Sequence, residues 1–165
     1  MAASEIVEHA KVTRGALYHH FSSGKRDLFE TVCEHVLQDL VNSLSSSLTP
    51  ASLSWDGIPD IFGAFFDAAS AQTFKQIILE DAPAVIGSQS LRVLEYKYSV
   101  RFIEVSLQAM IDAGVIRNIP TKPIAILIFG ACCEAALEIA FSKKPKETKS
   151  QAIDGLMALL QGIKE

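Results

Sequence analysis

Apolar residues recur at intervals of three and four along most of this 165-residue chain. This spacing places apolar side chains on one face of an α-helix, whereas a half-buried strand would alternate apolar and polar residues. The alternating pattern is nearly absent, so the sequence predicts an all-α fold. The clearest apolar stripe follows the turn Ser22-Ser23-Gly24 and consists of Phe29, Val32, Cys33, Val36, Leu37, Leu40, Val41 and Leu44.

Residues that start or stop helices give the expected boundaries. The long helix that carries this stripe is expected to end at Ser45–Ser47, ahead of a connector at Thr49-Pro50. Pro83 is expected to stop a short helix, Gly114 to end a long one, and Thr121 to cap the next. The helices predicted in this way cover residues 3–10, 13–20, 25–44, 59–66, 74–79, 88–113, 122–142 and 148–163.

The composition indicates an ordered globular protein. Hydrophobic residues make up 49% and charged residues 21% of the chain, and the net charge is −4. Three cysteines without metal-ligand spacing are typical of reduced thiols in a cytoplasmic protein. There is no secretory pattern, and the longest apolar run, residues 124–133, is too short to span a bilayer. We expect a cytoplasmic protein with no metal, no cofactor and no membrane partner.

Two short helices separated by a tight turn near the N-terminus form the pattern of a helix-turn-helix. The second of them begins with Thr13 as its cap and carries a cation at its start. Residues 1–30 hold four cations and four acids, so the remaining chain carries the whole net charge of −4. A recognition helix of this kind places its N-terminal residues in the major groove of DNA.

The second short helix contains residue types that can contact DNA bases. Arg14 can donate two hydrogen bonds to guanine O6 and N7, and Thr13 can touch a thymine methyl group or a phosphate. Gly15 and Ala16 are small enough to let the helix approach the groove closely. The alternative for Arg14 is a solvated surface charge.

Three further residues are candidates for phosphate contacts. Tyr18 and His19 lie at the end of the same helix and offer a hydroxyl group and an imidazole N–H. Lys25 lies in the first turn of the long helix, where its ammonium group and the helix N-terminus can bind one phosphate. Tyr18 as a core residue and Lys25 as an inert surface cation are the alternatives. His19 and His20 are not expected to bind a metal together, because neighbours on a helix point apart.

The segment from Glu5 to Phe21 resembles the DNA-binding head of the TetR family of bacterial transcriptional regulators. The run Gly15-Ala16-Leu17-Tyr18-His19-His20-Phe21, followed by a lysine at the start of a long helix, carries this resemblance. The resemblance implies the same phosphate-contacting roles for Tyr18, His19 and Lys25. It also implies an all-α, TetR-like fold, in which a helix-turn-helix head precedes a helical body that binds a ligand and dimerises.

The sequence departs from the family pattern at two places. The family usually has glycine where this chain has Lys11, and a left-handed turn there costs a non-glycine residue roughly 1 kcal/mol or more. The family's head also has a helix ahead of residue 2 that packs across the other two helices. We expect that helix to be supplied by a segment missing from this sequence.

The resemblance divides the chain at the long connecting helix. Residues 1–30 are expected to form a partial helix-turn-helix head that extends into the connecting helix to about residue 44. Residues 45–165 are expected to form the effector-binding and dimerisation domain. The resemblance implies an apolar effector pocket there, although a filled aromatic core is the alternative. The candidate lining residues are Phe62, Phe65, Phe66, Phe74, Tyr98, Phe102 and Met110.

The last two predicted helices, residues 122–142 and 148–163, are more apolar than one partner helix would bury. Pairing them with the same two helices of a second subunit would bury the excess in a four-helix interface. The family uses this arrangement, so we expect a homodimer. Its two heads would then bind the half-sites of a pseudo-palindromic operator.

We interpret the chain as a ligand-responsive, DNA-binding transcriptional regulator. In its simplest form it is a repressor that a small apolar effector releases from double-stranded DNA. The alternative is a dimeric small-molecule-binding or interaction protein whose incomplete head does not bind DNA. An enzyme is not expected, because the sequence shows no Ser/His/Asp order, metal-ligand spacing or Gly-rich phosphate loop.

Overall fold

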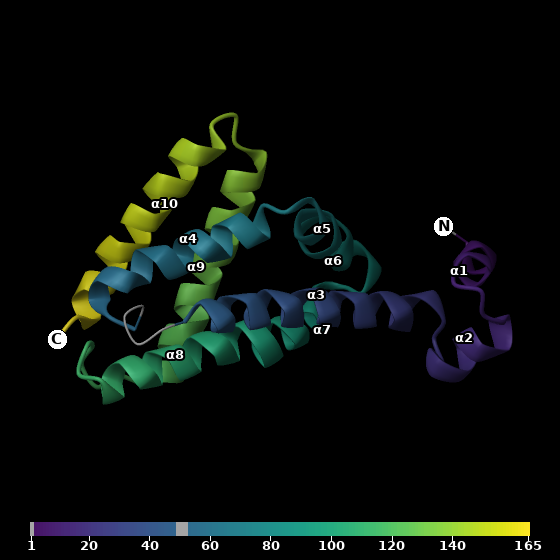
Figure 1. The fold of residues 1–165 in the computed structure, drawn as a ribbon, viewed down its shortest axis with the longest axis horizontal. Helices are drawn as coiled ribbons and strands as arrows, with labels where there is room; N and C mark the ends of the chain where they lie inside the picture. Colours follow the sequence, from purple (N-terminus) through teal and green to yellow (C-terminus); the bar gives the residue numbers. More distant parts are fainter. Residues whose placement is uncertain (1, 49–52) are drawn as a thin grey trace.

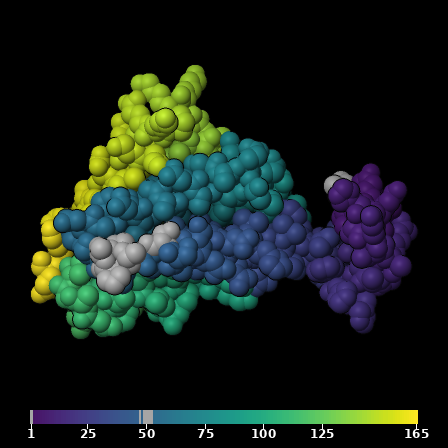
Figure 2. All heavy atoms as spheres, in the orientation of Figure 1, coloured from purple at the N-terminus to yellow at the C-terminus, as the bar shows by residue number. Residues whose placement is uncertain are grey.

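A single long helix joins a small head to a larger helical body (Figure 1). The structure, a computed structural model, describes residues 2–48 and 53–165. The head consists of α1 (Ala3–His9) and α2 (Arg14–His20), and the joining helix is α3 (Lys25–Ser47). Figure 2 shows the head as a separate lobe at one end of α3.

The body is arranged around α9 (Thr121–Phe141), which contacts α4 (Ile58–Ala69), α8 (Arg101–Asp112) and α10 (Pro145–Leu160). The described residues contain no strand, only an isolated bridge between Ile116 and Lys164, and the prediction of an all-α fold is confirmed. The other elements of the body are the 3₁₀-helix η1 (Trp55–Gly57), α5 (Gln72–Phe74), the π-helix η2 (Lys75–Asp81), α6 (Ala82–Val85), α7 (Ser88–Glu95), the π-helix η3 (Tyr96–Val100) and the 3₁₀-helix η4 (Gln161–Ile163).

Two of the predicted helix ends are wrong. Ser45–Ser47 do not dissolve the long helix, because α3 continues through Ser47 and Leu48 is its C-cap. Pro83 does not stop a helix either, because α6, which contains it, directly continues the helical segment that precedes it. The predicted connector at Thr49-Pro50 lies outside the described residues.

Two other boundaries agree with the turn residues that predicted them, and two differ. Pro59 lies in the first turn of α4, and Gly114 adopts φ 68° directly after α8. Thr121 is the first helical residue of α9 rather than its cap, which is Pro120. The last helix begins at Pro145, three residues before the predicted start at residue 148. The predicted helix over residues 88–113 forms as α7, η3 and α8 in direct succession.

The core of the body is formed by apolar side chains from all of its long helices. Cys33 and Leu37 of α3, Phe66 of α4 and Ile86 are the largest side chains that are fully buried. The head buries much less, because Val7 of α1 and Leu17 of α2 are its buried apolar residues within the described part of the chain. Apolar burial therefore contributes far more to the stability of the body than to that of the head.

Helix α9 is unusually apolar for a helix of a globular domain. By length and composition alone it could cross a membrane, although the core helix of a soluble protein meets the same test. With 21 residues, α9 extends beyond the apolar run over residues 124–133, which alone is too short to span a bilayer. One side of α9 packs into the body through Ala125, Ile128 and Cys132, whereas Leu127 and Phe141 are 68% and 66% exposed.

Candidate nucleic-acid interface and cavities of the body

The N-terminal end of α2 is open to solvent. Thr13 caps the helix, since its Oγ1 accepts a hydrogen bond of 3.1 Å from the backbone N–H of Ala16. Arg14 and Gly15 are exposed beside it, and Ala16 is half-buried. The structure therefore brings all four residues predicted to face bases to one exposed helix end, where N–H groups and a guanidinium group favour a polyanion.

The turn between α1 and α2 contains the left-handed residue that the sequence predicts. Lys11 has φ 55°, and it is the one non-glycine residue with positive φ in the described ranges. Its N–H donates to the carbonyl of Glu8, and the N–H of Val12 donates to the carbonyl of Val7 at 2.9 Å. These bonds close the turn and set the angle at which α2 leaves α1.

The ring of Tyr18 lies against the turn that leads into α3. Gly24 is buried with φ 68°, and a Cβ atom placed on it would be 3.0 Å from Cε1 of Tyr18. Tyr18 nevertheless remains 52% exposed. His19 and His20 are exposed at the end of α2, and their ring centroids are 5.3 Å apart. Tyr18 therefore has both a packing contact and an accessible side.

The first turn of α3 is held by a carboxylate that the sequence reasoning did not single out. The backbone N–H of Ser23 donates to Oδ2 of Asp27 at 2.7 Å, and the hydroxyl of Ser22 donates to the same oxygen at 3.2 Å. These bonds, the backbone bond most of all, hold the pKa of Asp27 below its usual value. Lys25 is exposed in this turn. The signal that could have revealed Asp27 is an acid near the start of a helix.

A second contact that the sequence did not reveal joins this end of α3 to the body. The guanidinium group of Arg26 donates a hydrogen bond of 2.9 Å to the backbone carbonyl of Ile86, directly after α6. The two residues are 60 positions apart in the sequence. No local pattern predicts a contact over such a separation.

The middle of α3 contacts the π-helix η3 through a carboxylate. Oε1 of Glu34 accepts hydrogen bonds from Lys97 Nζ at 2.5 Å and from the Tyr98 hydroxyl at 2.7 Å. These two bonds lower the pKa of Glu34, and the carboxylate in turn raises the pKa of Lys97. Tyr98, a predicted pocket residue, thus directs its hydroxyl to α3, and it is not among the residues that line the cavities described below.

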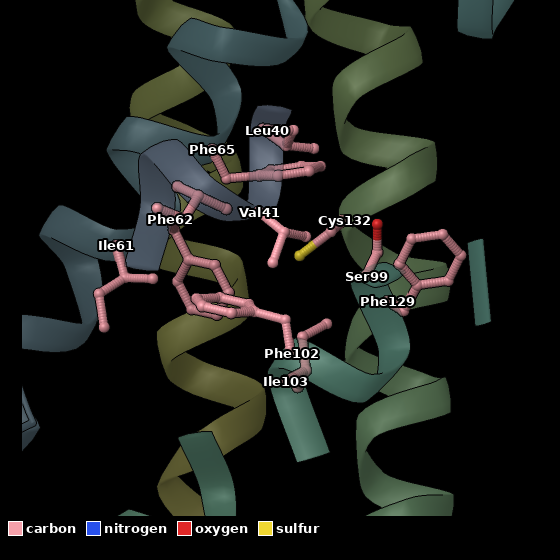
Figure 3. A pocket seen from close by; sticks show the side chains of 11 residues that line it. Leu40, Val41, Ile61, Phe62, Phe65, Ser99, Phe102, Ile103, Phe129 and Cys132 are labelled. Atoms are coloured by element: carbon pink, nitrogen blue, oxygen red, sulfur yellow. The ribbon is translucent and has the colours of Figure 1, made fainter. Parts of the chain in front are cut away.

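A small apolar cavity, which we call the central cavity, lies between α3, α4, η3, α8 and α9 (Figure 3). Its volume is ≈ 50 Å³, far below the roughly 300–1,000 Å³ of typical ligand pockets. Figure 3 shows Phe62 of α4 and Phe102 of α8 extending toward one another from their two helices. The lining residues are Leu40, Val41, Leu44, Ile61, Phe62, Phe65, Ser99, Phe102, Ile103, Phe129 and Cys132.

Two more cavities adjoin the central cavity. The C-terminal cavity, of ≈ 70 Å³, lies among α4, α8, α9 and the chain end, and Met110, Leu160 and Ile163 line it together with Phe62 and Phe102. The glutamate cavity, of ≈ 20 Å³, is lined by Phe74, Phe65, Glu95, Ser99 and Cys133 among others.

The predicted pocket residues therefore have different positions. Phe62, Phe65, Phe74, Phe102 and Met110 line one or more of these cavities. Phe66 has no exposed surface and belongs to the packed core. Glu95 and Ser99, which line the glutamate cavity, were not predicted, because a polar residue within an amphipathic helix gives no sequence signal for a cavity.

Cys33 of α3 and Cys132 of α9 are buried, and Cys133 is half-buried. Burial raises the pKa of Cys132 and of Cys133 to about 12, and that of Cys33 to about 11. Among the residues that the structure describes, no group of three or more His, Cys, Asp or Glu side chains is arranged to hold a metal ion.

Comparison with known proteins identifies both parts of the chain. A family model described as "Bacterial regulatory proteins, tetR family" matches residues 1–32, and one described as "Tetracyclin repressor-like, C-terminal domain" matches residues 55–163. The Transposon Tn10 TetC protein of Escherichia coli is 21% identical over 165 residues, which cover 100% of this chain and 83% of that protein.

Solved structures agree with this match. A TetR-family transcriptional regulator from Pectobacterium atrosepticum is 28% identical with a TM-score of 0.75, and the match covers 98% of this chain and 82% of that one. A putative TetR-family regulator from Syntrophomonas wolfei shares the fold with a TM-score of 0.77 at 17% identity, over 98% and 85% of the two chains.

These matches bear on the two interpretations of the sequence. The family model for the DNA-binding part matches the region that contains α1 and α2, so an interaction protein without a DNA-binding function is not favoured. The family consists of regulators, which is consistent with a protein that is not an enzyme. Because the model for the C-terminal domain alone spans more than half of the chain, the protein belongs to the TetR family of transcriptional regulators.

Proposed function

We propose that this protein is a cytoplasmic, ligand-responsive repressor that binds a pseudo-palindromic operator as a homodimer. The observation that carries the proposal is the exposed N-terminal end of α2, where Thr13, Arg14 and Gly15 form a surface suited to the major groove. This end belongs to the head, which α3 holds away from the body, so a DNA duplex can reach it (Figure 2).

The residues of the head divide into two groups under this proposal. Arg14 reads a guanine, and Thr13, Gly15 and Ala16 permit close approach to the base edges. Tyr18, His19 and Lys25 contact phosphates on either side and fix the position of the helix in the groove. The exposure of all three side chains supports this role.

The dimer that we propose uses α9 and α10. Leu127 and Phe141 of α9 and Leu159 of α10 are exposed, at 68%, 66% and 74%. Exposed apolar side chains of this size on adjacent helices are typical of an interface. A two-fold axis through these helices would place two heads on one side of the dimer, as two half-sites require.

An effector would bind in the central and C-terminal cavities, whose linings are apolar. Both cavities are small as they stand, so a ligand must move side chains such as Phe62 and Phe102, which line both. Movement at Phe102 would reach η3, and Glu34 links η3 to α3. Coupling of this kind typically changes DNA affinity by about 1–3 kcal/mol.

The test is binding of the protein, produced as its gene encodes it, to the DNA upstream of that gene. Fluorescence anisotropy at several salt concentrations should give a specific complex whose affinity falls steeply as salt rises. Binding of that DNA no tighter than of a shuffled sequence would contradict the proposal. Release of the DNA by an effector is measured on the same complex.

A further inference from the structure

Residues 161–165, which we call the strap, lie across one end of the C-terminal cavity and follow α10 directly. Figure 1 shows this end of the chain beside the segment that leaves α8. Ile116, in that segment, forms an isolated antiparallel bridge with Lys164. The backbone N–H of Arg117 donates a hydrogen bond of 3.1 Å to the carbonyl of Ile163. The strap is therefore attached to the connection between α8 and α9.

Two cations hold the strap without lining the cavity. The guanidinium group of Arg117 donates a hydrogen bond to the carbonyl of Gly162, and the ammonium group of Lys164 lies 5.0 Å from the centroid of the Trp55 ring. Lys164 is exposed, and a cation–π contact at an exposed site is weak. Because neither cation lines the cavity, both can be removed without changing the lining.

The strap is the weakest wall of this cavity. All but two of the lining residues belong to α4, α8, α9 and α10, which are 12, 12, 21 and 16 residues long. The other two are Ile116 and Ile163, at the contact between the strap and the segment after α8. Ile163 is half-buried, and the remaining strap residues are exposed. A segment with so few buried contacts opens at a lower free energy than core helices, which stay in place.

We propose that the strap is a gate, through which an uncharged, apolar effector enters the C-terminal cavity. This inference rests on the effector site proposed above and adds the route by which a ligand reaches it. The strap closes again over the bound ligand and restores the same bridge and cation contacts. The gate therefore sets the rates of entry and exit, whereas the lining of the cavity sets the affinity.

The rate at which an apolar dye enters the whole protein, without DNA, tests the gate. The probe is 1-N-phenylnaphthylamine, an uncharged dye whose fluorescence rises in apolar surroundings, and stopped-flow fluorescence follows its binding. The double variant Arg117→Ala/Lys164→Ala loosens the strap and keeps the lining, so association and dissociation should each become about tenfold faster. The Kd should change by less than about twofold, because the gate affects entry and exit equally.

Lys149→Ala is the matched control. Lys149 pairs with Asp67 of α4 at 2.6 Å, so this variant also removes a cation that joins two elements of the body. It lies in the first part of α10, at the opposite end from the strap, and does not line the cavity. Its dye kinetics should equal those of the parent protein. Unchanged kinetics in the double variant, equal acceleration in the control, or no dye binding by the parent protein would overturn the inference.

Filling the cavity shows whether the dye occupies it. Ser106 lines the C-terminal cavity and neither of the other two, and Ser106→Leu places additional carbon atoms there. The affinity for the dye should fall at least about fivefold, because the added side chain takes the space of the ligand. Unchanged affinity would place the dye elsewhere and overturn the inference. Thermal unfolding followed by circular dichroism shows that each variant retains the fold.

Hydrogen exchange measured by NMR detects the opening without any ligand. The N–H of Arg117 is bonded to the strap, whereas the N–H of Val115 donates to the carbonyl of Met110 at 2.9 Å and does not depend on the strap. Lys164→Ala should speed the exchange of the Arg117 N–H at least about threefold and leave that of Val115 unchanged. Equal effects on the two amides, or no effect on either, would refute the gate.

Failure of this inference is distinguishable from failure of the proposed function. Operator binding is measured without ligand, whereas dye kinetics and hydrogen exchange are measured without DNA. A protein that binds its operator but is insensitive to the strap variants remains a regulator whose effector enters by another route. A protein that gates the dye but binds no operator keeps the strap as a gate and contradicts the proposed repressor.

Discussion

Lys11 holds a backbone conformation that favours glycine, in the turn that orients the recognition helix. Its φ of 55° is the left-handed conformation expected at this position, where related proteins usually have glycine. Gly24 has φ 68° and has no side chain, which leaves room for the Tyr18 ring. Two backbone positions with positive φ, one strained and one relaxed, therefore set the geometry of the head.

Substituting Lys11 should reveal this strain. Lys11→Gly is expected to be more stable than Lys11→Ala by up to about 1 kcal/mol, because glycine relieves the left-handed conformation and alanine does not. Urea unfolding of both variants at neutral pH measures the difference in the free energy of unfolding. Equal stability of the two would show that the turn stores no strain.

Arg14 and Lys25 should differ in what their loss does to DNA binding. Arg14→Ala should cost about 1–3 kcal/mol on the operator and relax its sequence preference, because a base contact is lost. Lys25→Ala should weaken binding to all sequences and reduce the salt slope by about 1. Anisotropy titrations on operator and random DNA give both quantities. If both variants lost affinity equally on the two DNAs, the division into base and phosphate contacts would be wrong.

The head could be predicted from the sequence because its contacts are local. Thr13 bonds to a backbone group three residues away, and Lys11 occupies a turn of known shape. Arg26 and Glu34 instead bond to partners 60 or more positions away, which no periodicity indicates. The predicted end at Ser45–Ser47 was wrong because serine disfavours a helix only weakly: α3 continues through these residues, and the hydroxyl of Ser46 donates to the carbonyl of Ser43 at 2.8 Å.

At the scale of the elements, polar side chains of α3 bind the body at two positions along the helix. Arg26 binds the end of α6 near the head, and Glu34 binds η3 in the middle of the helix. π-Helical segments are rare and are frequently found at functional sites. Since Ser99 of η3 also lines the central cavity, this segment lies between the proposed effector and α3.

Loss of the Tyr98 hydroxyl should weaken this link. Tyr98→Phe should lower the free energy of unfolding by about 1 kcal/mol, because a partly buried bond to a carboxylate is lost. Tyr96→Phe on the same π-helix is the control and should change it by less than about 0.5 kcal/mol, since Tyr96 is exposed. Chemical unfolding of the three proteins gives the comparison.

The hydrogen bond between Tyr98 and Glu34 should make the stability of the protein depend on pH. The pKa of Glu34 is lowered in the folded protein. The ionised carboxylate therefore stabilises the fold fully at pH values above the unfolded-state pKa of about 4.3. That contribution is lost as the pH falls through the lower, folded pKa. The difference in stability between Tyr98→Phe and the parent protein should therefore be largest at neutral pH and shrink in acid. An unchanged difference would mean that the charge of Glu34 contributes nothing.

At the scale of the whole molecule, Leu127 and Phe141 of α9 and Leu159 of α10 are exposed apolar side chains that the dimer we propose would cover. Leu159→Lys should convert the proposed dimer to monomers, because it places a charge in the apolar interface. Val93→Lys is the matched control, since Val93 is 63% exposed on α7, away from the proposed interface. Light scattering on a sizing column measures both masses. Monomers in the parent protein, or dimers in Leu159→Lys, would contradict the proposed interface.

The length of α3 turns small angles into large displacements. Its 23 residues span about 35 Å at a rise of about 1.5 Å per residue. A tilt of about 5° at the body end therefore displaces the head by about 3 Å. A dimer on half-sites about 34–36 Å apart has two heads. Two such displacements would change the distance between the recognition helices, which would then no longer match the spacing of the major grooves. Because Arg26 and Glu34 bind α3 to the end of α6 and to η3, such a tilt requires these elements to move with the helix.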